Sequence, residues 1–275
     1  MHQQKIHKAI SIDGIVIAGK VVGKGDPLVL LPPGPAECEQ GWEHALPSLE
    51  QHFRCYLMNT RGRGLSEDHE DHSPSKLVED VLTFSESIGE SVTLLEWGSG
   101  LWAYVAAQSH PAIKAVAVYE PGADEVMADA DAAQVNEVFE TVWALSAQGR
   151  VKEAAAFFIK HSQVFYTDED LGTGIPFDFW QMAAEYLPMY LAEQNAIYES
   201  VMPGPMDPSV LTQVEVPVLI MQGTKTTPYF VDSVEYVAKH VQNPIVRKID
   251  KAAHYGPCLH PEVFVNELTV FLKSI

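Results

Sequence analysis

A glutamate and a histidine are the residues of this sequence whose types and positions could do chemistry together. Glu120 ends the apolar run 113–120, and His254 lies between a predicted last strand and a C-terminal helix. A carboxylate at the end of an apolar strand is costly to bury without a partner, and an imidazole is its natural partner. Such a histidine can act as a general base. In the alternative interpretation, Glu120 is a solvated loop residue before Pro121.

Alternating strands and helices must position these two side chains. Short apolar runs with β-branched residues predict strands, and apolar positions at helical spacing predict helices between them. After a strand–turn–strand start, the predicted strands are 27–34, 54–60, 91–97, 113–120, 216–223 and 244–249, and the predicted helices are 39–51, 75–89, 101–108, 229–240 and 261–275. Strands that alternate with helices predict an α/β fold, with a mostly parallel sheet covered by helices on both faces.

The pattern changes after Pro121. Residues 122–210 show helix-like segments without a confident strand, and they hold twelve of the chain's 26 aromatic residues. The α/β alternation then resumes. We therefore predict one core, formed by residues 1–121 and 211–275, with residues 122–210 inserted as a helical cap.

Five spaced features together resemble the α/β-hydrolase fold, over essentially the whole chain. In chain order they are Pro33-Gly34, Arg61-Gly62-x-Gly64-x-Ser66, Glu96-Trp97-Gly98-Ser99-Gly100, Gln222-Gly223 and the late His254 before a terminal amphipathic helix. Each of the first four lies at the end of a predicted strand or directly after it. The resemblance implies a nucleophile on a strand-to-helix turn, a histidine base, an acid that orients it, and backbone donors for an oxyanion.

Within that superfamily the chain is most similar to the fungal zearalenone lactonases, which open resorcylic acid lactones. The segments that carry this similarity are 30–40, 97–100, 119–122, 223–233 and 254–264, and the last two are the most specific. The similarity implies a lactone, ester or ketone of polyketide type as the substrate.

The nucleophile position departs from the family pattern. The turn normally reads Gly-x-Ser-x-Gly, but Gly98 stands where the serine belongs and Glu96 occupies the first small position. Glycine has no side chain to attack with. If Ser99 were the nucleophile, its flanking small positions would be the bulky Trp97 and Leu101. A third interpretation makes residues 98–100 a tight turn without catalytic meaning.

The resemblance also assigns the remaining roles. It makes His254 the general base and, because Thr226 occupies the usual acid position without a carboxylate, it makes Glu120 the acid, as in the lactonases. The oxyanion donors would be the backbone N–H groups of Gly34 and Ser99, since Pro35 has no N–H.

The same comparison predicts the substrate contacts. The lactonases use a tryptophan of the cap, which here corresponds to Trp180, and Pro33 and Trp97 border the predicted site.

Three functional interpretations follow from the missing serine. The chain is a Ser-to-Gly variant of a lactonase or esterase, a natural enzyme of another reaction class such as a lyase, cyclase or isomerase, or a non-catalytic small-molecule-binding protein on a hydrolase scaffold. In the first two interpretations His254 is required for turnover, by the parent enzyme or by this chain.

The net negative charge argues against two classes of binding partner. The formal net charge is −19, from 18 basic and 37 acidic residues, which argues against nucleic acid and against an anionic membrane surface. Neither a secretory signal nor an apolar run near ~18 residues is visible, so we expect a cytoplasmic protein. The oligomeric state stays open between a monomer and a homodimer.

We predict neither a cofactor nor a metal. Cys38, Cys55 and Cys258 lack metal-like spacing and are interpreted as free thiols. The segment 67–72 has metal-friendly residue types, but it is interpreted as a solvated acidic loop.

Overall fold

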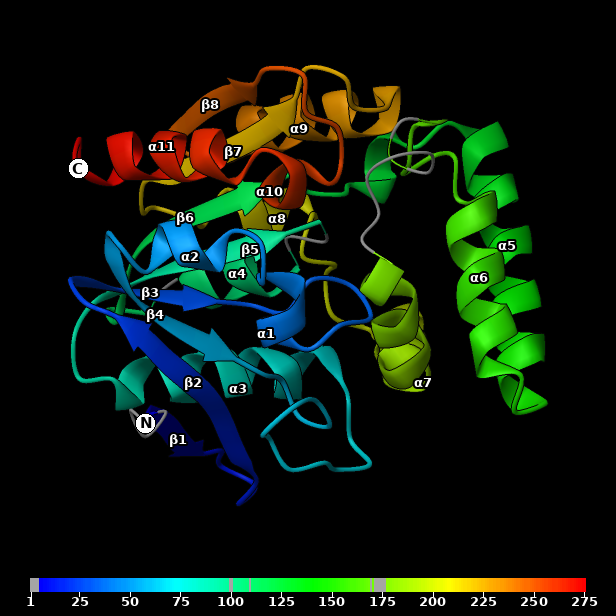
Figure 1. Ribbon diagram of the computed structural model, residues 1–275, viewed down its shortest axis with the longest axis horizontal. Helices are drawn as coiled ribbons and strands as arrows, with labels where there is room; N and C mark the ends of the chain where they lie inside the picture. Colours follow the sequence, from blue (N-terminus) through cyan, green and yellow to red (C-terminus); the bar gives the residue numbers. More distant parts are fainter. Residues whose placement is uncertain (1–4, 99–100, 109, 169, 171–176) are drawn as a thin grey trace.

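A twisted β-sheet, whose strands alternate with helices along most of the chain, forms the centre of the protein (Figure 1). The computed structural model describes residues 5–98, 101–108, 110–168, 170 and 177–275, without the side chains of residues 101 and 177–183. The strands are β1 (Lys5–Ile10), β2 (Val16–Gly23), β3 (Asp26–Leu30), β4 (Phe53–Met58), β5 (Val92–Trp97), β6 (Ile113–Tyr119), β7 (Val218–Gly223) and β8 (Pro244–Ile249).

The sheet is mostly parallel, as its sequence pattern predicts. Its strand order is β1-β2-β4-β3-β5-β6-β7-β8. β2 runs antiparallel to both β1 and β4, whereas β3 to β8 pair in parallel. Parallel strands place their carboxyl ends at one edge, so the loops after β3, β5, β6 and β8 open on the same side.

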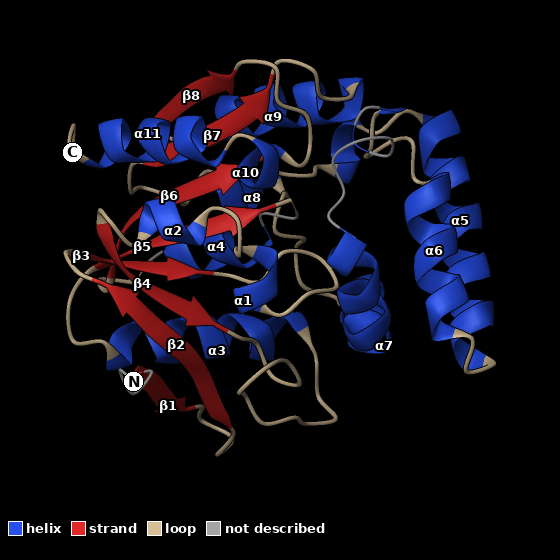
Figure 2. Ribbon diagram, viewed as in Figure 1, coloured by secondary structure: helices blue, strands red, loops and turns tan. Residues whose placement is uncertain are grey.

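Helices cover both faces of the sheet (Figure 2). They are α1 (Cys38–Gly41), α2 (Leu46–Leu49), α3 (Pro74–Ser87), α4 (Leu101–Ala107), the 3-10 helix η1 (Asp124–Val126), α5 (Asp129–Ala147), α6 (Val151–His161), α7 (Phe177–Glu199), α8 (Pro208–Leu211), α9 (Pro228–His240), α10 (Gly256–Leu259) and α11 (Pro261–Leu272). Among the described residues, none of these helices is long and apolar enough to cross a bilayer.

Each face of the sheet has its own hydrophobic core. Leu28 and Leu30 of β3 pack in the cluster that contains Trp42 and residues of α11, while Val29 packs in the opposite cluster with residues of α3 and α4. This division follows from the alternation of side chains along a strand. Burial on both faces explains why these strands are continuous apolar runs.

One predicted helix is wrong. The segment 39–51, expected to be a single helix, forms the two one-turn helices α1 and α2 with a turn between them. Pro47 lies in the first turn of α2. Proline cannot donate the backbone hydrogen bond that a continuous helix needs at this position, which explains the interruption.

The described part of the segment between β6 and β7 is helical, as expected. Figure 1 shows α5, α6 and α7 beyond the carboxyl ends of the parallel strands, and these three helices pack against one another in sequence order. The division into a core and a cap at residues 121/122 and 210/211 stays a prediction.

The cysteines are free thiols, in agreement with their spacing. Cys38 and Cys55 are buried, and Cys258 is partly buried. Burial raises the pKa of Cys55 and of Cys258 to about 12, so both are protonated and unreactive at neutral pH.

Candidate active site

Glu120 lies directly after β6 in a strained backbone conformation. Its φ of 48° is in the left-handed region, which is rare for a residue other than glycine. The carboxylate is fully buried; Oε1 accepts the backbone N–H of Gly223 at 2.9 Å. Oε2 lies 2.9 Å from Nδ1 of His254. Backbone strain that surrounding contacts maintain is typical of functional sites.

His254 lies in the loop between β8 and α10, with its ring held from several sides. Its imidazole stacks on Phe230 at a centroid distance of 4.4 Å and an interplanar angle of 7°. Tyr166 contacts the ring edge-on at 5.5 Å. The indole N–H of Trp97 donates to the backbone carbonyl of His254 at 2.9 Å, which fixes the loop. The hydrogen bond to Glu120 assigns the proton to Nδ1, so Nε2 is left as an acceptor.

Gly98 faces this imidazole, and because glycine has no side chain, the space between them holds none from residue 98. It follows β5 with a φ of 89°. Its backbone N–H donates to the backbone carbonyl of Tyr119, and its own carbonyl accepts from the backbone N–H of Gly122, both at 2.9 Å. An ideal Cβ at residue 98 would lie 3.7 Å from Nε2 of His254. A side chain here would therefore point at the histidine, as a nucleophile does on a strand-to-helix turn.

Glu96, the large residue at a position that is usually small in the family pattern, contacts the helix after the turn. Its side chain is buried, and Oε2 accepts the backbone N–H of Ala103 in α4 at 3.0 Å. The carboxylate thereby compensates a free N–H near the start of the helix. Sequence comparison marked Glu96 as a departure but did not reveal this helix contact.

The structure describes some of the other predicted site residues and not the rest. Gly34 and Pro33 border the same cavity as Gly98 and His254, together with Trp97. Ser99 and the side chain of Trp180 lie outside the described residues. Their roles as oxyanion donor and substrate contact stay predictions. The buried hydroxyl of Thr226 makes no hydrogen bond to a described residue.

Arg63 is a part of the site that sequence reasoning missed. Its guanidinium donates to the carbonyls of Gly34 at 2.6 Å and Ala36 at 2.9 Å, and to the Glu193 carboxylate of α7 at 2.5 Å. Both charged side chains are buried. One cation thus holds the loop that carries Gly34 and ties it to α7. An arginine among turn residues gives no sequence signal for such a contact.

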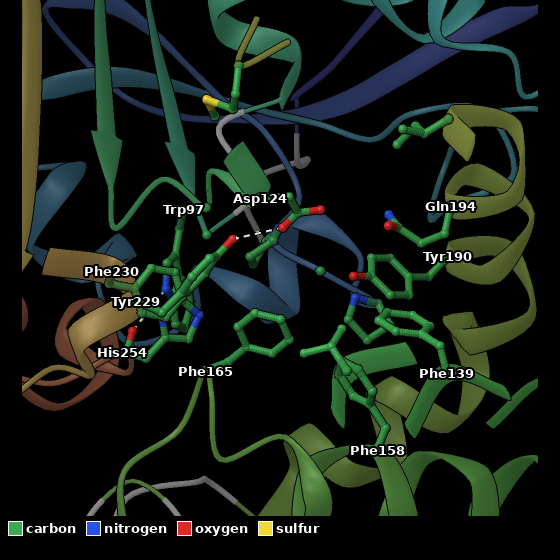
Figure 3. Close-up of a pocket in the computed structure, with 18 of the residues that line it drawn as sticks. Trp97, Asp124, Phe139, Phe158, Phe165, Tyr190, Gln194, Tyr229, Phe230 and His254 are labelled. Atoms are coloured by element: carbon green, nitrogen blue, oxygen red, sulfur yellow. Dashed lines mark hydrogen bonds between the residues drawn. The ribbon is translucent and has the colours of Figure 1, made fainter. Parts of the chain in front are cut away.

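A cavity of about 270 Å³ lies between these loops and the helices α5 to α7 (Figure 3). Aromatic side chains contribute a large share of its wall: Trp97, Phe139, Phe158, Phe165, Tyr166, Tyr190, Tyr198, Tyr229, Phe230 and Tyr255. His254 and Gly98 contribute to the wall on the side of the sheet. This volume is slightly below the ~300–1,000 Å³ that is usual for small-molecule sites.

The cavity thus lies at the carboxyl edge of an α/β sheet, the place where ligands bind in open sheets of this kind. The family model for the alpha/beta hydrolase family matches residues 28–267, and the chain belongs to that family. A search of curated protein sequences gives no match.

Solved structures show the same fold. A serine hydrolase involved in carbazole degradation is 17% identical over 99% of this chain and 100% of its own, with a TM-score of 0.74. A bromoperoxidase from Bacillus anthracis is 20% identical over 98% and 100% of the two chains, with a TM-score of 0.77. An esterase from Exiguobacterium antarcticum is 18% identical over 97% and 99%, with a TM-score of 0.76. The finer similarity to zearalenone lactonases stays a prediction.

Proposed function

We propose that the protein is an enzyme in which His254, oriented by Glu120, acts as a general base directly on its substrate or on a water molecule, without a covalent intermediate. The observation that carries this proposal is the empty position at Gly98. An ideal Cβ there lies 3.7 Å from Nε2 of His254, so the base faces free space in the cavity.

The Glu120–His254 pair supports base chemistry. The carboxylate bonds Nδ1 at 2.9 Å, and the N–H of Gly223 holds its second oxygen. This geometry favours the tautomer that accepts a proton at Nε2, and the carboxylate stabilises the imidazolium that forms. The side chain of His254 is 12% exposed, so the base is accessible from the cavity and shielded from bulk water.

The reaction we favour is proton abstraction from water or from a carbon acid next to a carbonyl group. In the hydrolytic case, the water oxygen bonds the carbonyl carbon while its proton passes to Nε2. The leaving alkoxide then takes that proton, and the products are an acid and an alcohol. The aromatic wall supports a lactone, ester or ketone of polyketide type as the substrate.

A second candidate is a non-catalytic small-molecule-binding protein on the hydrolase scaffold. The specific observation in its favour is the absence of a side chain at residue 98, the position that faces the base. A Ser-to-Gly inactivated lactonase or esterase would share this feature.

The test is turnover of a panel of resorcylic lactones, aryl esters and β-diketones by the unmodified chain. We expect at least one compound to be converted, with conversion lost in His254→Ala and retained in His44→Ala, which removes an exposed histidine. If compounds raise the melting temperature but none is converted, the binding function is correct. Conversion that survives His254→Ala contradicts the proposed base.

A further inference from the structure

The charged groups of the cavity are unevenly distributed. Asp124 and Glu125, both in η1, are the acidic residues of its described lining, and none of the described lining residues is a lysine or an arginine. The mechanism proposed above uses neither carboxylate. Their presence therefore bears on which ligand the cavity takes.

Asp124 lines the cavity, and its side chain is accessible to solvent. The neighbouring residues desolvate the carboxyl and raise its pKa above the ordinary value. The Tyr229 hydroxyl donates to Oδ1 at 3.1 Å, as drawn in Figure 3. Among the described residues, Asp124 forms no ion pair. Within the described part of the chain, this carboxyl therefore has one neutral donor and no counter-ion.

Aromatic rings surround the space that this carboxylate faces. Phe139, Phe158 and Tyr190 come from α5, α6 and α7, and Phe165 contacts Tyr229 at a centroid distance of 5.3 Å. Figure 3 shows these rings around the cavity. The face of an aromatic ring attracts a cation, most strongly where water is excluded. Rings together with an unpaired carboxylate favour a positively charged ligand group.

We propose that the cavity takes an organic cation, an apolar body with an amine or quaternary ammonium group that lies against Asp124 and the aromatic wall. This inference rests on the proposed function and adds to it that the lactone, ester or ketone substrate carries such a cationic group. The same field disfavours anionic ligands, since no described lining residue supplies a lysine or arginine to pair with them. The net charge of −19 attracts cations to the molecule as a whole.

Three phenols of similar shape separate charge from size. They are 4-hydroxyphenyl-trimethylammonium, its neutral isostere 4-tert-butylphenol, and the anion 4-hydroxybenzoate. We expect calorimetry to show the ammonium compound binding at least tenfold more tightly than the neutral isostere, with the anion weakest. Equal affinity for the first two, or a preference for the anion, overturns the inference.

Two variants test whether the preference for the ammonium compound over its neutral isostere arises in the cavity. Asp124→Asn should reduce the preference for the ammonium compound to about threefold or less, whereas Asp232→Asn, which removes an exposed charge from α9, should leave it unchanged. An unchanged preference in Asp124→Asn contradicts the inference. If Asp124→Asn does not fold, Glu125→Gln and a salt series on the unmodified chain decide. Added salt should weaken binding of the ammonium compound and not of the neutral one.

Ligand preference tests this inference, whereas turnover tests the proposed base chemistry on which it rests. His254→Ala should keep the ammonium preference while it loses turnover. A chain with the preference but without turnover contradicts the proposed base chemistry alone. A chain with turnover but without the preference contradicts the proposed substrate class alone.

Discussion

The two walls of the cavity are held in different ways. On the sheet side, Glu120, His254 and Gly98 are each fixed by hydrogen bonds to neighbouring strands or loops. On the helical side, rings of α5, α6 and α7 pack on one another, and the buried Arg63–Glu193 pair ties α7 to the core. Hydrogen bonds are directional and ring packing is much less so. We infer from this comparison that the sheet side supplies the proposed base chemistry and that the helical side shapes the space for the ligand.

The largest expected effect is a gain of activity on the sheet side. In Gly98→Ser the hydroxyl would point at Nε2 of His254, and p-nitrophenyl ester hydrolysis should rise by at least ~10³-fold, since loss of a serine nucleophile costs about 10⁶-fold in a serine protease. The positive φ strains a serine by about 1–3 kcal/mol, which lowers stability but leaves the direction of the hydroxyl intact. Gly98→Ala carries the same strain without the hydroxyl and should gain nothing. Equal rates in the two variants would contradict the assignment.

The next effect concerns the orientation of the base. Glu120→Gln keeps an oxygen for the N–H of Gly223 but presents an amide NH₂ to Nδ1, which favours the opposite tautomer of His254. We expect ester hydrolysis in the Gly98→Ser background to fall by ~10²–10⁴-fold. Glu235→Gln, an exposed change on α9, serves as the control. A loss below twofold would show that Glu120 has only a structural role.

On the helical side, the largest effect is on stability. Arg63→Ala leaves the Glu193 carboxylate buried without its cation, and breaking a buried pair in this way costs about 3–5 kcal/mol. Urea unfolding measures the loss. Arg54→Ala removes a partly exposed partner of Glu90 and should cost about 1 kcal/mol or less. Similar losses for the two variants would mean that the tie between α7 and the core is weak.

The smallest effect is a gain of stability at Asp124. Burial raises the pKa of this carboxyl in the folded state, so the folded chain binds more protons than the unfolded chain between the two pKa values. Stability therefore falls as pH rises through that window. Asp124→Asn should therefore raise the melting temperature slightly at pH 7. The difference should vanish below the unfolded pKa, and a melting temperature that falls at pH 7 would show that the carboxylate stabilises the fold.

The sheet and the edge that carries the candidate site were largely predictable from the sequence. The runs that form β5, β6 and β7 are buried on both faces, and their apolar composition together with the alternation of strands and helices predicted a parallel sheet. Their carboxyl ends bring Gly98, Glu120 and Gly223 together by topology. The missing carboxylate at Thr226 and the resemblance to the lactonases predicted the bond between Glu120 and His254, which the structure shows at 2.9 Å.

The helical wall was not predictable to the same degree. Its contacts join residues far apart in the chain, such as Arg63 with Glu193 and Tyr229 with Asp124, and neither pair has a local pattern. Aromatic side chains at helical spacing give the same signal whether they fill a core or line a cavity. Only the tertiary arrangement separates the two cases.

Labelling with a fluorophosphonate probe tests the central claim most directly, because the probe reacts preferentially with a serine that a neighbouring base activates. The account predicts no modification of the unmodified chain, rapid modification of Gly98→Ser at residue 98 by mass spectrometry, and its loss when His254→Ala is added. Modification of the unmodified chain at Ser99 would contradict the account, and so would a Gly98→Ser variant that folds but stays unlabelled.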